Sequence, residues 1–297
     1  MKRLFFFPLL LLSMISYSQI GLGTINPSMS AVLDISSTTK GLLPPRMTFQ
    51  QINAIASPAA GLMIWCTNCA GYGQIHVYNG TIWTNLNGGE AGTPHGAFVG
   101  LNVWKNFMPH NLGADTTLDP SDPVQGINGN YYQWGRRTEV AYYYTSSSAI
   151  SGWNTSNVPD DAWQSSIKTI NDPCPPGYRI PYINELNSLQ SYNSFIRNGS
   201  WEVLETGSPA NFSCALSFGV STNPKTLTLP AAGRRQPSAG TLYGRGNFGT
   251  YWTSNVAPDA DNGEKKAYDF YFTINQIPLN PTGFRNTGFS VRCISEN

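Results

Sequence analysis

The sequence predicts an α+β fold with few helices, several short strands and long ordered loops. Asn79-Gly80 separates two strand-like runs and is the strongest short hairpin signal in the chain. Apolar residues between 183 and 189 recur at helical spacing. Apolar and polar residues alternate over 268–274 and again over 289–293, which indicates two half-buried strands.

The N-terminus has the pattern of a cleavable signal peptide over residues 1–18. Met1-Lys2-Arg3 is followed by an almost wholly apolar run, and Ser16-Tyr17-Ser18 places small residues before a cleavage that leaves Gln19 first. The apolar run has about a dozen residues, whereas ~20 are needed to span a bilayer, so a membrane anchor is the less favoured alternative. We therefore expect a secreted or outer-surface protein with no membrane span after cleavage.

The composition favours a loop-rich protein that binds its partners through loops. Charged residues make up 12% of the chain and the net charge is +1, which argues against a nucleic-acid partner because such proteins carry a basic face. The 29 glycines and 21 prolines indicate many loops. The 12% of aromatic residues excludes a disordered chain.

Residues 19–90 are predicted to form a small β-rich N-terminal module. Thr48 and Gln51 make a capping box for a short helix over 49–55. The apolar run 62–66 and the two runs beside Asn79-Gly80 then predict a three-stranded meander. Because this module is small and would be exposed alone, we expect it to pack on the next domain or on copies of itself.

Residues 91–97 have the composition of a flexible linker, and the second domain is predicted to cover 98–297. In that domain, Pro181 fits the first turn of a helix that contains the apolar positions between 183 and 189. The rest is expected to be short strands and ordered loop.

The mature chain has five cysteines, for which we expect two disulfides in an oxidising compartment. We pair Cys174 with Cys293 and Cys66 with Cys69, which leaves Cys214 free; a Cys174–Cys214 bridge is the alternative. A redox function for the C-x-x-C pair is less favoured, because the pair lies between two strand patterns rather than at a helix N-terminus. No zinc site is expected, because the histidines are scattered without ligand spacing: His76, His95 and His110.

Six motifs occur in order through the second domain: Trp104-Lys-Asn-Phe-Met-Pro-His-Asn-Leu112, Tyr132-Gln-Trp-Gly-Arg136, Cys174-Pro-Pro-Gly-Tyr-Arg-Ile-Pro181, Leu229-Pro-Ala-Ala-Gly-Arg234, Gly249-Thr-Tyr-Trp-Thr-Ser254 and Gly288-Phe-Ser-Val-Arg-Cys293. This set resembles the Fibrobacter succinogenes major paralogous domain, a family of exported bacterial domains. The family is similar in pattern to C-type-lectin-like folds and to the formylglycine-generating enzyme group. The resemblance therefore implies a C-type-lectin-like domain, although Tyr182 departs from the Thr or Ser usual at the start of the family's helix.

The stretch from Gly21 to Met47 includes Ala31-Val-Leu-Asp-Ile-Ser36 and Lys40-Gly-Leu-Leu-Pro-Pro-Arg46. It is similar to leader modules of exported Bacteroidetes proteins and of some fibre-like proteins. This resemblance implies a homotrimer or an extended stalk.

Two stretches rich in aromatic and basic residues are the candidate ligand surfaces. The first contains Tyr142, Tyr143 and Tyr144, whose rings can stack on sugars or anchor a protein contact. In C-type-lectin-like folds the ligand face is built from late loops held by the long disulfide. The resemblance therefore implies a second surface whose contact residues are Arg235, Tyr243, Arg245, Trp252 and Arg285.

No catalytic residue, cofactor or metal site is expected. The nucleophile elbow, the H-E-x-x-H motif and phosphate-binding glycine loops are absent from the sequence. Formylglycine-generating chemistry uses a pair of cysteines, and only Cys214 remains free after the long bridge forms. Asp259-Ala-Asp261-Asn-Gly-Glu264 is similar to the start of a calcium loop but lacks the bidentate glutamate at position twelve, so a solvated loop is expected.

The sequence thus predicts a secreted or cell-surface, non-catalytic recognition or adhesion protein that binds glycan or protein ligands. The first alternative is a structural subunit of a surface fibre or trimeric stalk. The second is a modifying enzyme of the formylglycine-generating type.

Overall fold

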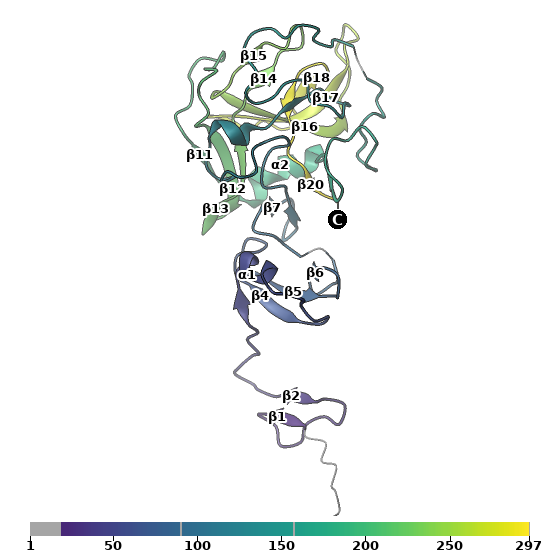
Figure 1. The fold of residues 1–297 in the computed structure, drawn as a ribbon, viewed down its shortest axis with the longest axis vertical. Coiled ribbons are helices and arrows are strands. Elements are labelled where there is room, and N and C mark those ends of the chain that lie inside the picture. The colour runs from purple at the N-terminus through teal and green to yellow at the C-terminus, as the bar shows by residue number, and fades with distance from the viewer. Residues whose placement is uncertain (1–18, 90, 157, 297) are drawn as a thin grey trace, which may run out of the picture. The chain divides into compact units, whose positions relative to one another are not determined.

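The computed structural model describes residues 19–89, 91–156 and 158–296. The chain divides into two compact units, with the boundary between Pro44 and Pro45 (Figure 1). The expected signal peptide over residues 1–18 lies outside the described residues.

The described part of the first unit, residues 19–44, contains one small sheet and no core. Strands β1 (Ile20–Leu22) and β2 (Leu33–Ile35) pair in parallel, with Leu22 opposite Ile35. The amide of Ser36 extends this pairing by donating to the carbonyl oxygen of Leu22 at 2.9 Å. None of the residues 19–44 is buried. A two-stranded sheet without a covered face is marginally stable at best, so contacts outside this segment are needed to stabilise it.

Large apolar side chains are exposed along most of this first unit. Met29 and Val32 are 95% and 78% exposed. Over the described residues 19–44, the exposed apolar side chains are Ile20, Leu22, Ile25, Met29, Val32, Leu33, Ile35, Leu42 and Leu43. Soluble proteins rarely leave so many neighbouring apolar side chains in water, and exposed patches of this kind mark interaction surfaces.

The second unit begins with a four-stranded sheet in the order β3-β4-β5-β6. Its strands are β3 (Arg46–Met47), β4 (Met63–Cys66), β5 (Gln74–Tyr78) and β6 (Trp83–Thr84). Strand β3 joins β4 in parallel, and the predicted antiparallel meander of β4, β5 and β6 is confirmed. Strand β6 is shorter than expected because Asn79 Oδ1 accepts hydrogen bonds from the amides of Thr81 and Ile82, both at 2.9 Å, which keeps these residues in the turn.

The predicted capping box is also confirmed, and it starts α1 (Phe49–Asn53). The amide of Gln51 donates to Thr48 Oγ1 at 3.3 Å, and the amide of Thr48 donates to Gln51 Oε1 at 2.8 Å. Ile52 on this helix packs with Ile64 and the two nearby cysteines in a small core.

Residues 91–97, expected as a flexible linker, are partly ordered by a hairpin of β7 (Gly96–Phe98) and β8 (Trp104–Asn106). Asn106 Oδ1 accepts from the amide of Thr93 at 2.8 Å, and its amide nitrogen donates to the carbonyl of Ala91 at 3.0 Å. Gly96 is required here, because a Cβ would lie 2.3 Å from the carbonyl oxygen of Lys105. Composition alone does not reveal these close contacts.

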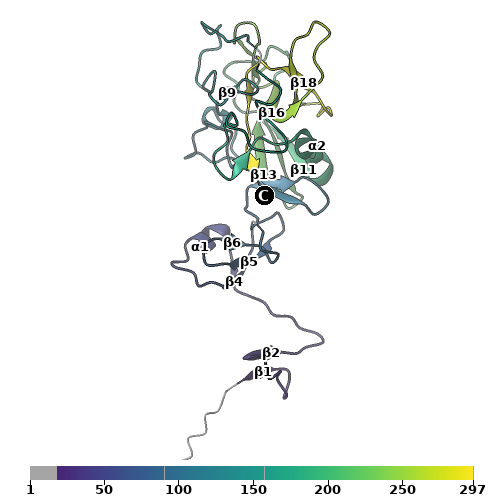
Figure 2. The same cartoon turned by 90° about the vertical axis from the view of Figure 1, so that its right-hand side faces the viewer.

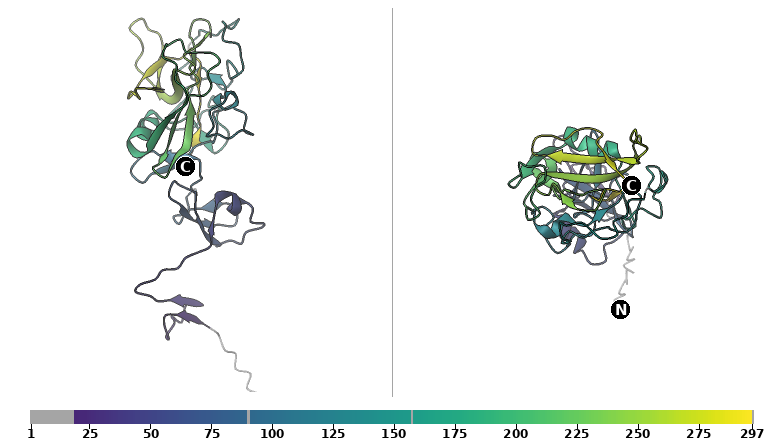
Figure 3. Two further views of the ribbon diagram at one scale, coloured as in Figure 1. Left: turned by 90° about the vertical axis from the view of Figure 1, so that its left-hand side faces the viewer. Right: turned by 90° about the horizontal axis from the view of Figure 1, so that it is seen from above.

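A five-stranded sheet in the order β18-β17-β16-β19-β9 forms the centre of the C-terminal part. Its long antiparallel pair is seen from above in Figure 3. The strands are β9 (Tyr131–Tyr132), β16 (Phe248–Val256), β17 (Lys266–Thr273), β18 (Thr282–Phe284) and β19 (Phe289–Ser290). The short helix η1 (Gln125–Asn128) precedes β9.

A three-stranded antiparallel sheet and two short pairs complete the strands. The sheet comprises β11 (Ser194–Asn198), β12 (Ala215–Val220) and β13 (Asn223–Pro230). The pairs are β10 (Tyr178–Arg179) with β20 (Ile294–Ser295), and β14 (Arg234–Arg235) with β15 (Leu242–Tyr243).

The predicted second helix is α2 (Ile183–Tyr192), which packs against β16 and β17 (Figure 2). Ile183, Leu186 and Leu189 are its buried residues, as their spacing predicts. Tyr182 is the N-cap, so Pro181 precedes the helix rather than lying in its first turn as expected. The carboxylate of Glu185 fixes this start by accepting hydrogen bonds from the amide of Tyr182 and from Arg179.

Both predicted disulfides are present, Cys174–Cys293 and Cys66–Cys69, and Cys214 is free and buried. The long bridge joins residues 119 apart and lies in a core with Trp134, Trp163 and Trp252. A second core brings Phe218, Phe270 and Phe272 together with the apolar face of α2.

The predicted exposure of the two C-terminal strand patterns is wrong in part. Each pattern predicted one face exposed to solvent. Asp269 is buried although it lies on the face of β17 opposite Phe270 and Phe272, which pack with the apolar residues of α2. Every residue from 289 to 293 is buried, although only Phe289 and Ser290 are paired in β19. Arg292 is accommodated because its guanidinium donates to Asn111 Oδ1 at 3.0 Å and to the carbonyl of Thr228 at 2.8 Å.

The described residues thus form an α+β fold dominated by short strands, as predicted. Within this part of the chain, no helix is long and apolar enough to cross a membrane.

Candidate functional site

The predicted contact residue Arg235 lies inside the protein. Its side chain is completely buried, and burial lowers the pKa of the guanidinium. Its Nη1 donates to the carbonyl of Ser146 at 2.6 Å, and its Nη2 donates to the carbonyl of Thr145 at 2.7 Å. The guanidinium also lies 5.2 Å from the ring centre of Tyr131. Arg235 therefore holds a loop from within.

Arg245 is also buried and also contacts Tyr131. It is 4% exposed, and its Nη2 donates to the hydroxyl of Tyr131 at 3.0 Å and to the carbonyl of Tyr143 at 3.3 Å. Its Nη1 donates to the carbonyl of Pro209 at 2.7 Å. This arginine joins two loops that are distant in the sequence.

Arg285 and Trp252 belong to the core around the long disulfide. The Arg285 guanidinium lies 4.3 Å from the ring centre of Trp134 and donates to Asp160 Oδ1 at 2.7 Å. The indole of Trp252 packs on Phe289 with ring centres 4.1 Å apart, and its nitrogen donates to the carbonyl of Tyr132 at 2.7 Å. Both side chains are 1% exposed or less.

The structure therefore corrects the expectation that Arg235, Arg245, Trp252 and Arg285 offer exposed contact atoms. The chain has only 17 acidic residues and many loops, so its buried arginines donate mainly to loop carbonyl oxygens. The sequence shows the arginines and the loops, but not which loop carbonyls face inward. The fifth residue of this predicted surface, Tyr243, is half-buried, with Arg234 lying 5.4 Å from its ring centre.

The three predicted tyrosines form an ordered cluster at the surface, which we call the tyrosine loop (residues 142–145). The rings of Tyr142 and Tyr144 are stacked, with centres 5.2 Å apart and an interplanar angle of 6°. Tyr143 meets Tyr144 edge-on at 5.0 Å. Tyr142 is 43% exposed and Tyr144 is 61% exposed. These rings offer flat apolar faces to solvent.

The tyrosine loop is held by hydrogen bonds on its inner side. The amide of Tyr142 donates to Thr145 Oγ1 at 2.9 Å, which closes the turn. Arg235 binds the carbonyl of Thr145 and Arg245 binds that of Tyr143. The two predicted surfaces thus come together, with the arginines inside and the tyrosines outside. A hydrogen bond to Glu139, together with the negative charge of that carboxylate, raises the pKa of Tyr142.

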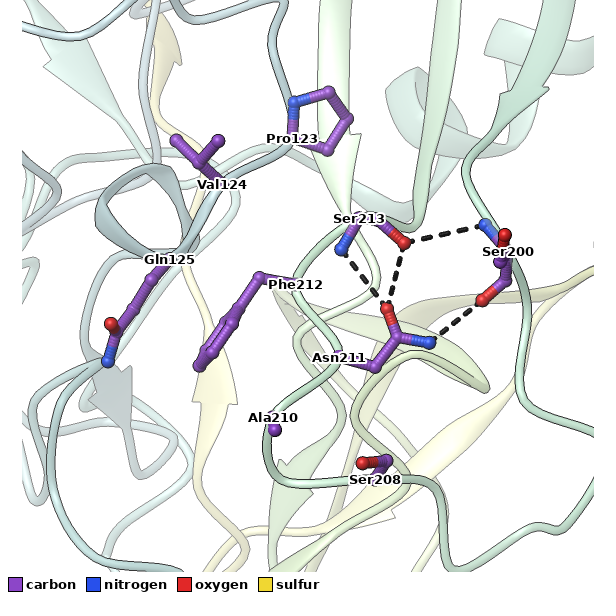
Figure 4. Close-up of a pocket in the computed structure, with 9 residues that line it drawn as sticks. All are labelled: Pro123, Val124, Gln125, Ser200, Ser208, Ala210, Asn211, Phe212 and Ser213. Atoms are coloured by element: carbon purple, nitrogen blue, oxygen red, sulfur yellow. Dashed lines mark hydrogen bonds between the residues drawn. The ribbon is translucent and has the colours of Figure 1, made fainter.

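A shallow pocket of about 580 Å³ lies elsewhere on the same part of the chain (Figure 4). The amide group of Asn211 donates to the carbonyl of Ser200 at 2.8 Å and accepts from Ser213 Oγ at 2.9 Å, so its polar wall is already ordered. Among the described residues that line this pocket, none has a titratable side chain. Its lining residues are Pro123, Val124, Gln125, Ser200, Ser208, Ala210, Asn211, Phe212 and Ser213, none of which the sequence singled out.

One group of metal-ligating residues occurs where none was expected. Atoms of Cys66, Cys69 and His76 that can bind a metal all lie within 4.8 Å of one another. The sequence separation between His76 and the two cysteines matches no known metal-binding motif. The pairing of β4 with β5 places His76 beside them. The acidic loop at 259–264 behaves as expected of a solvated loop, with Asp259 paired to Lys265 at 2.8 Å.

Cys214 has none of the features of a nucleophile. It is buried, and burial raises the pKa of its thiol, so the thiolate is disfavoured at neutral pH. Its sulfur donates to the carbonyl of Ser200 at 3.0 Å.

Comparison with known proteins bears on the N-terminal part of the chain. Residues 21–100 match a family described as the phage tail like trimerisation region. This region contains β1 apart from Ile20, all of β2, the capped helix α1 and the four-stranded sheet of β3 to β6. Comparisons with curated proteins and with solved structures gave no match.

Proposed function

We propose that the chain is a non-catalytic structural subunit of a homotrimer at the cell surface or outside the cell. The N-terminal segment joins three copies, and the domain from residue 98 onward is carried as a head that recognises glycan or protein ligands. The observation that carries this proposal is the segment 19–44, which has paired strands, many exposed apolar side chains and no buried residue.

The segment 19–44 fits assembly with identical copies better than attachment to its own chain. Its two strands leave edges whose amide and carbonyl groups are unpaired in the sheet, and such edges pair readily with further strands. Burying Leu22, Leu33 and Ile35 against copies would supply about 1.5–3 kcal/mol for each side chain. The match of residues 21–100 to a trimerisation region supports three copies rather than two.

The tyrosine loop supports the recognition part of the proposal. Stacked, exposed rings fixed by buried arginines present a rigid apolar face, which costs little conformational entropy on binding. Three heads on one stalk would also raise the apparent affinity for repeated ligands without any new contact. The C-type-lectin-like fold implied by the motif resemblance would suit such a head.

The assembly is tested by light scattering coupled to size exclusion with the mature chain. We expect a trimer for the wild type and a monomer for Leu22→Asp combined with Ile35→Asp. Val203→Asp is the matched control, since Val203 is 93% exposed but lies outside the first unit, and it should leave the trimer intact. A wild-type chain that stays monomeric at high concentration would contradict the proposal.

Recognition is tested separately with glycan and matrix-protein arrays. A specific signal should fall at least tenfold when Tyr142 and Tyr144 are both changed to alanine, while Tyr192→Ala, an exposed tyrosine on α2, should not reduce it. Equal signals from the two variants would contradict a role of the tyrosine loop in ligand binding.

A further inference from the structure

A histidine occupies the small core beneath the four-stranded sheet, together with two cysteines. His76 is 1% exposed, and Cys66 and Cys69 are fully buried. The other members of this core are apolar: Ile52 and Ile64, with Met47, Phe49 and Trp83 packed against them. Among the described residues, no other three side chains of His, Cys, Asp or Glu bring their ligand atoms so close together.

The strand register places the imidazole beside the sulfurs. His76 pairs with Ile64, and Cys66 pairs with Gln74 two positions away. Side chains on diagonal positions of an antiparallel pair lie on the same face, so His76 and Cys66 point into the same core. Cys69 follows in the turn after β4, three residues from Cys66. The fold thus gathers one nitrogen and two sulfurs within 4.8 Å.

His76 makes no hydrogen bond of normal geometry in this core, although its ring lies near the backbone of Gly92. Neither ring nitrogen has a hydrogen-bond partner among the described residues. An unpartnered buried polar group costs about 1–3 kcal/mol, and an apolar residue would avoid this cost. A neutral imidazole with a free nitrogen is the form that binds metals.

We propose that Cys66, Cys69 and His76 form a site for a thiophilic metal ion such as zinc in the reduced chain. Two thiolates and one imidazole supply three of the four ligands that zinc prefers, and leave one position open. The ion would occupy the core where the disulfide lies in the oxidised chain, and it would satisfy the His76 nitrogen that is otherwise unpartnered.

The disulfide and the metal site exclude each other. Each thiol loses a proton when its sulfur binds the ion. When a disulfide-containing oxidant takes two electrons from these sulfurs, the Cys66–Cys69 bond forms, the oxidant takes up two protons to become a dithiol, and the ion leaves. The structure contains the oxidised state, with the bond formed. Metal binding at this site would therefore depend on the redox state of the compartment in which the chain lies.

Alkylation mapping of the full chain tests the site residue by residue. The chain is reduced with a phosphine, incubated with or without zinc, treated with iodoacetamide and digested for mass spectrometry. Zinc should slow alkylation of Cys66 and Cys69 at least tenfold and leave Cys174 and Cys293 unchanged. Equal rates at Cys66 and Cys69 with and without zinc would overturn the proposal.

The histidine is tested by competition of the reduced chain with a chelating dye. His76→Leu should weaken zinc binding at least tenfold. His95→Leu, which changes a histidine directly before β7, should not weaken it. In the oxidised chain, His76→Leu should keep or raise the melting temperature, because it removes an unpartnered polar group. Undiminished zinc binding by reduced His76→Leu would overturn the proposal, as would equal zinc uptake by the oxidised wild type. Neither result would affect the proposed trimer.

Discussion

Arg235 donates a hydrogen bond of 2.7 Å from Nη2 to the carbonyl oxygen of Thr145, which lies 90 residues earlier in the chain. The same guanidinium donates from Nη1 to the carbonyl of Ser146 at 2.6 Å. A completely buried cation thus fixes the loop that presents Tyr142 and Tyr144 to solvent. The sequence suggested the arginine and the tyrosines as parts of two separate ligand surfaces. In the structure, the arginine supports the loop that carries the exposed tyrosines.

Arg235→Ala should therefore destabilise the protein and loosen the tyrosine loop together. Hydrogen bonds to charged groups contribute about 1.5–3 kcal/mol each, and two loop carbonyls would lose their donors, so we expect a loss of about 3–6 kcal/mol in the free energy of unfolding. Urea denaturation measures the loss, and proteolysis near residue 145 measures the loosening. Arg137→Ala is the control, because this arginine is exposed and should cost less than about 0.5 kcal/mol. Equal losses in the two variants would contradict this role of Arg235.

Removing the long disulfide should cost more stability than removing the short one. In the chain-entropy model, a loop closed by residues 119 apart is worth about 4–5 kcal/mol, whereas one closed by residues three apart is worth about 2 kcal/mol. Cys174→Ser with Cys293→Ser should thus lower the midpoint of urea unfolding well below that of Cys66→Ser with Cys69→Ser. The reverse order would show that strain or packing, rather than loop length, decides the contribution of each bridge.

Asp269 should make the protein less stable as the pH rises. Burial raises its pKa to about 8 in the folded chain, against about 3.9 when unfolded. Between these values the folded chain holds a proton that the unfolded chain has released, so stability falls by up to about 1.4 kcal/mol per pH unit. Below pH of about 4 both states are protonated and the effect vanishes.

Asp269→Asn keeps the position neutral at every pH and tests this directly. Its melting temperature should equal that of the wild type near pH 4 and exceed it increasingly toward pH 8. Asp122→Asn, at an exposed loop position, serves as the control and should not show this trend. A difference between Asp269→Asn and the wild type that stays constant with pH would mean that Asp269 is ionised in the folded chain.

Local patterns predicted those elements whose determinants are close in sequence. Thr48 and Gln51 are three residues apart, and Asn79-Gly80 forms its own turn, so α1 and the hairpin were accessible from the sequence. The helical spacing of Leu186 and Leu189 likewise located α2. Predictions of exposure failed at Asp269 and Arg292, because the second face of each strand is covered by segments far away in the chain.

The candidate sites show the same division. The tyrosine loop was found because its three rings are consecutive, whereas the burial of Arg235 and Arg245 depends on carbonyl oxygens about 90 and 102 residues distant. His76 was dismissed as a ligand because its distance from Cys66 matches no motif, although strand pairing brings them together. Register, unlike local turn chemistry, is set by both strands at once.

Segment 19–44 has paired strands but buries none of its own residues, so its folding free energy must come from contacts outside that segment. The remainder of the described chain has its own hydrophobic cores, so its stability need not depend on contacts with other copies. If three copies complete the segment, its ordered population depends on the third power of the concentration of free chains. In that case heads would fold before they are joined, so dilute chains would stay separate and concentrated chains would form trimers.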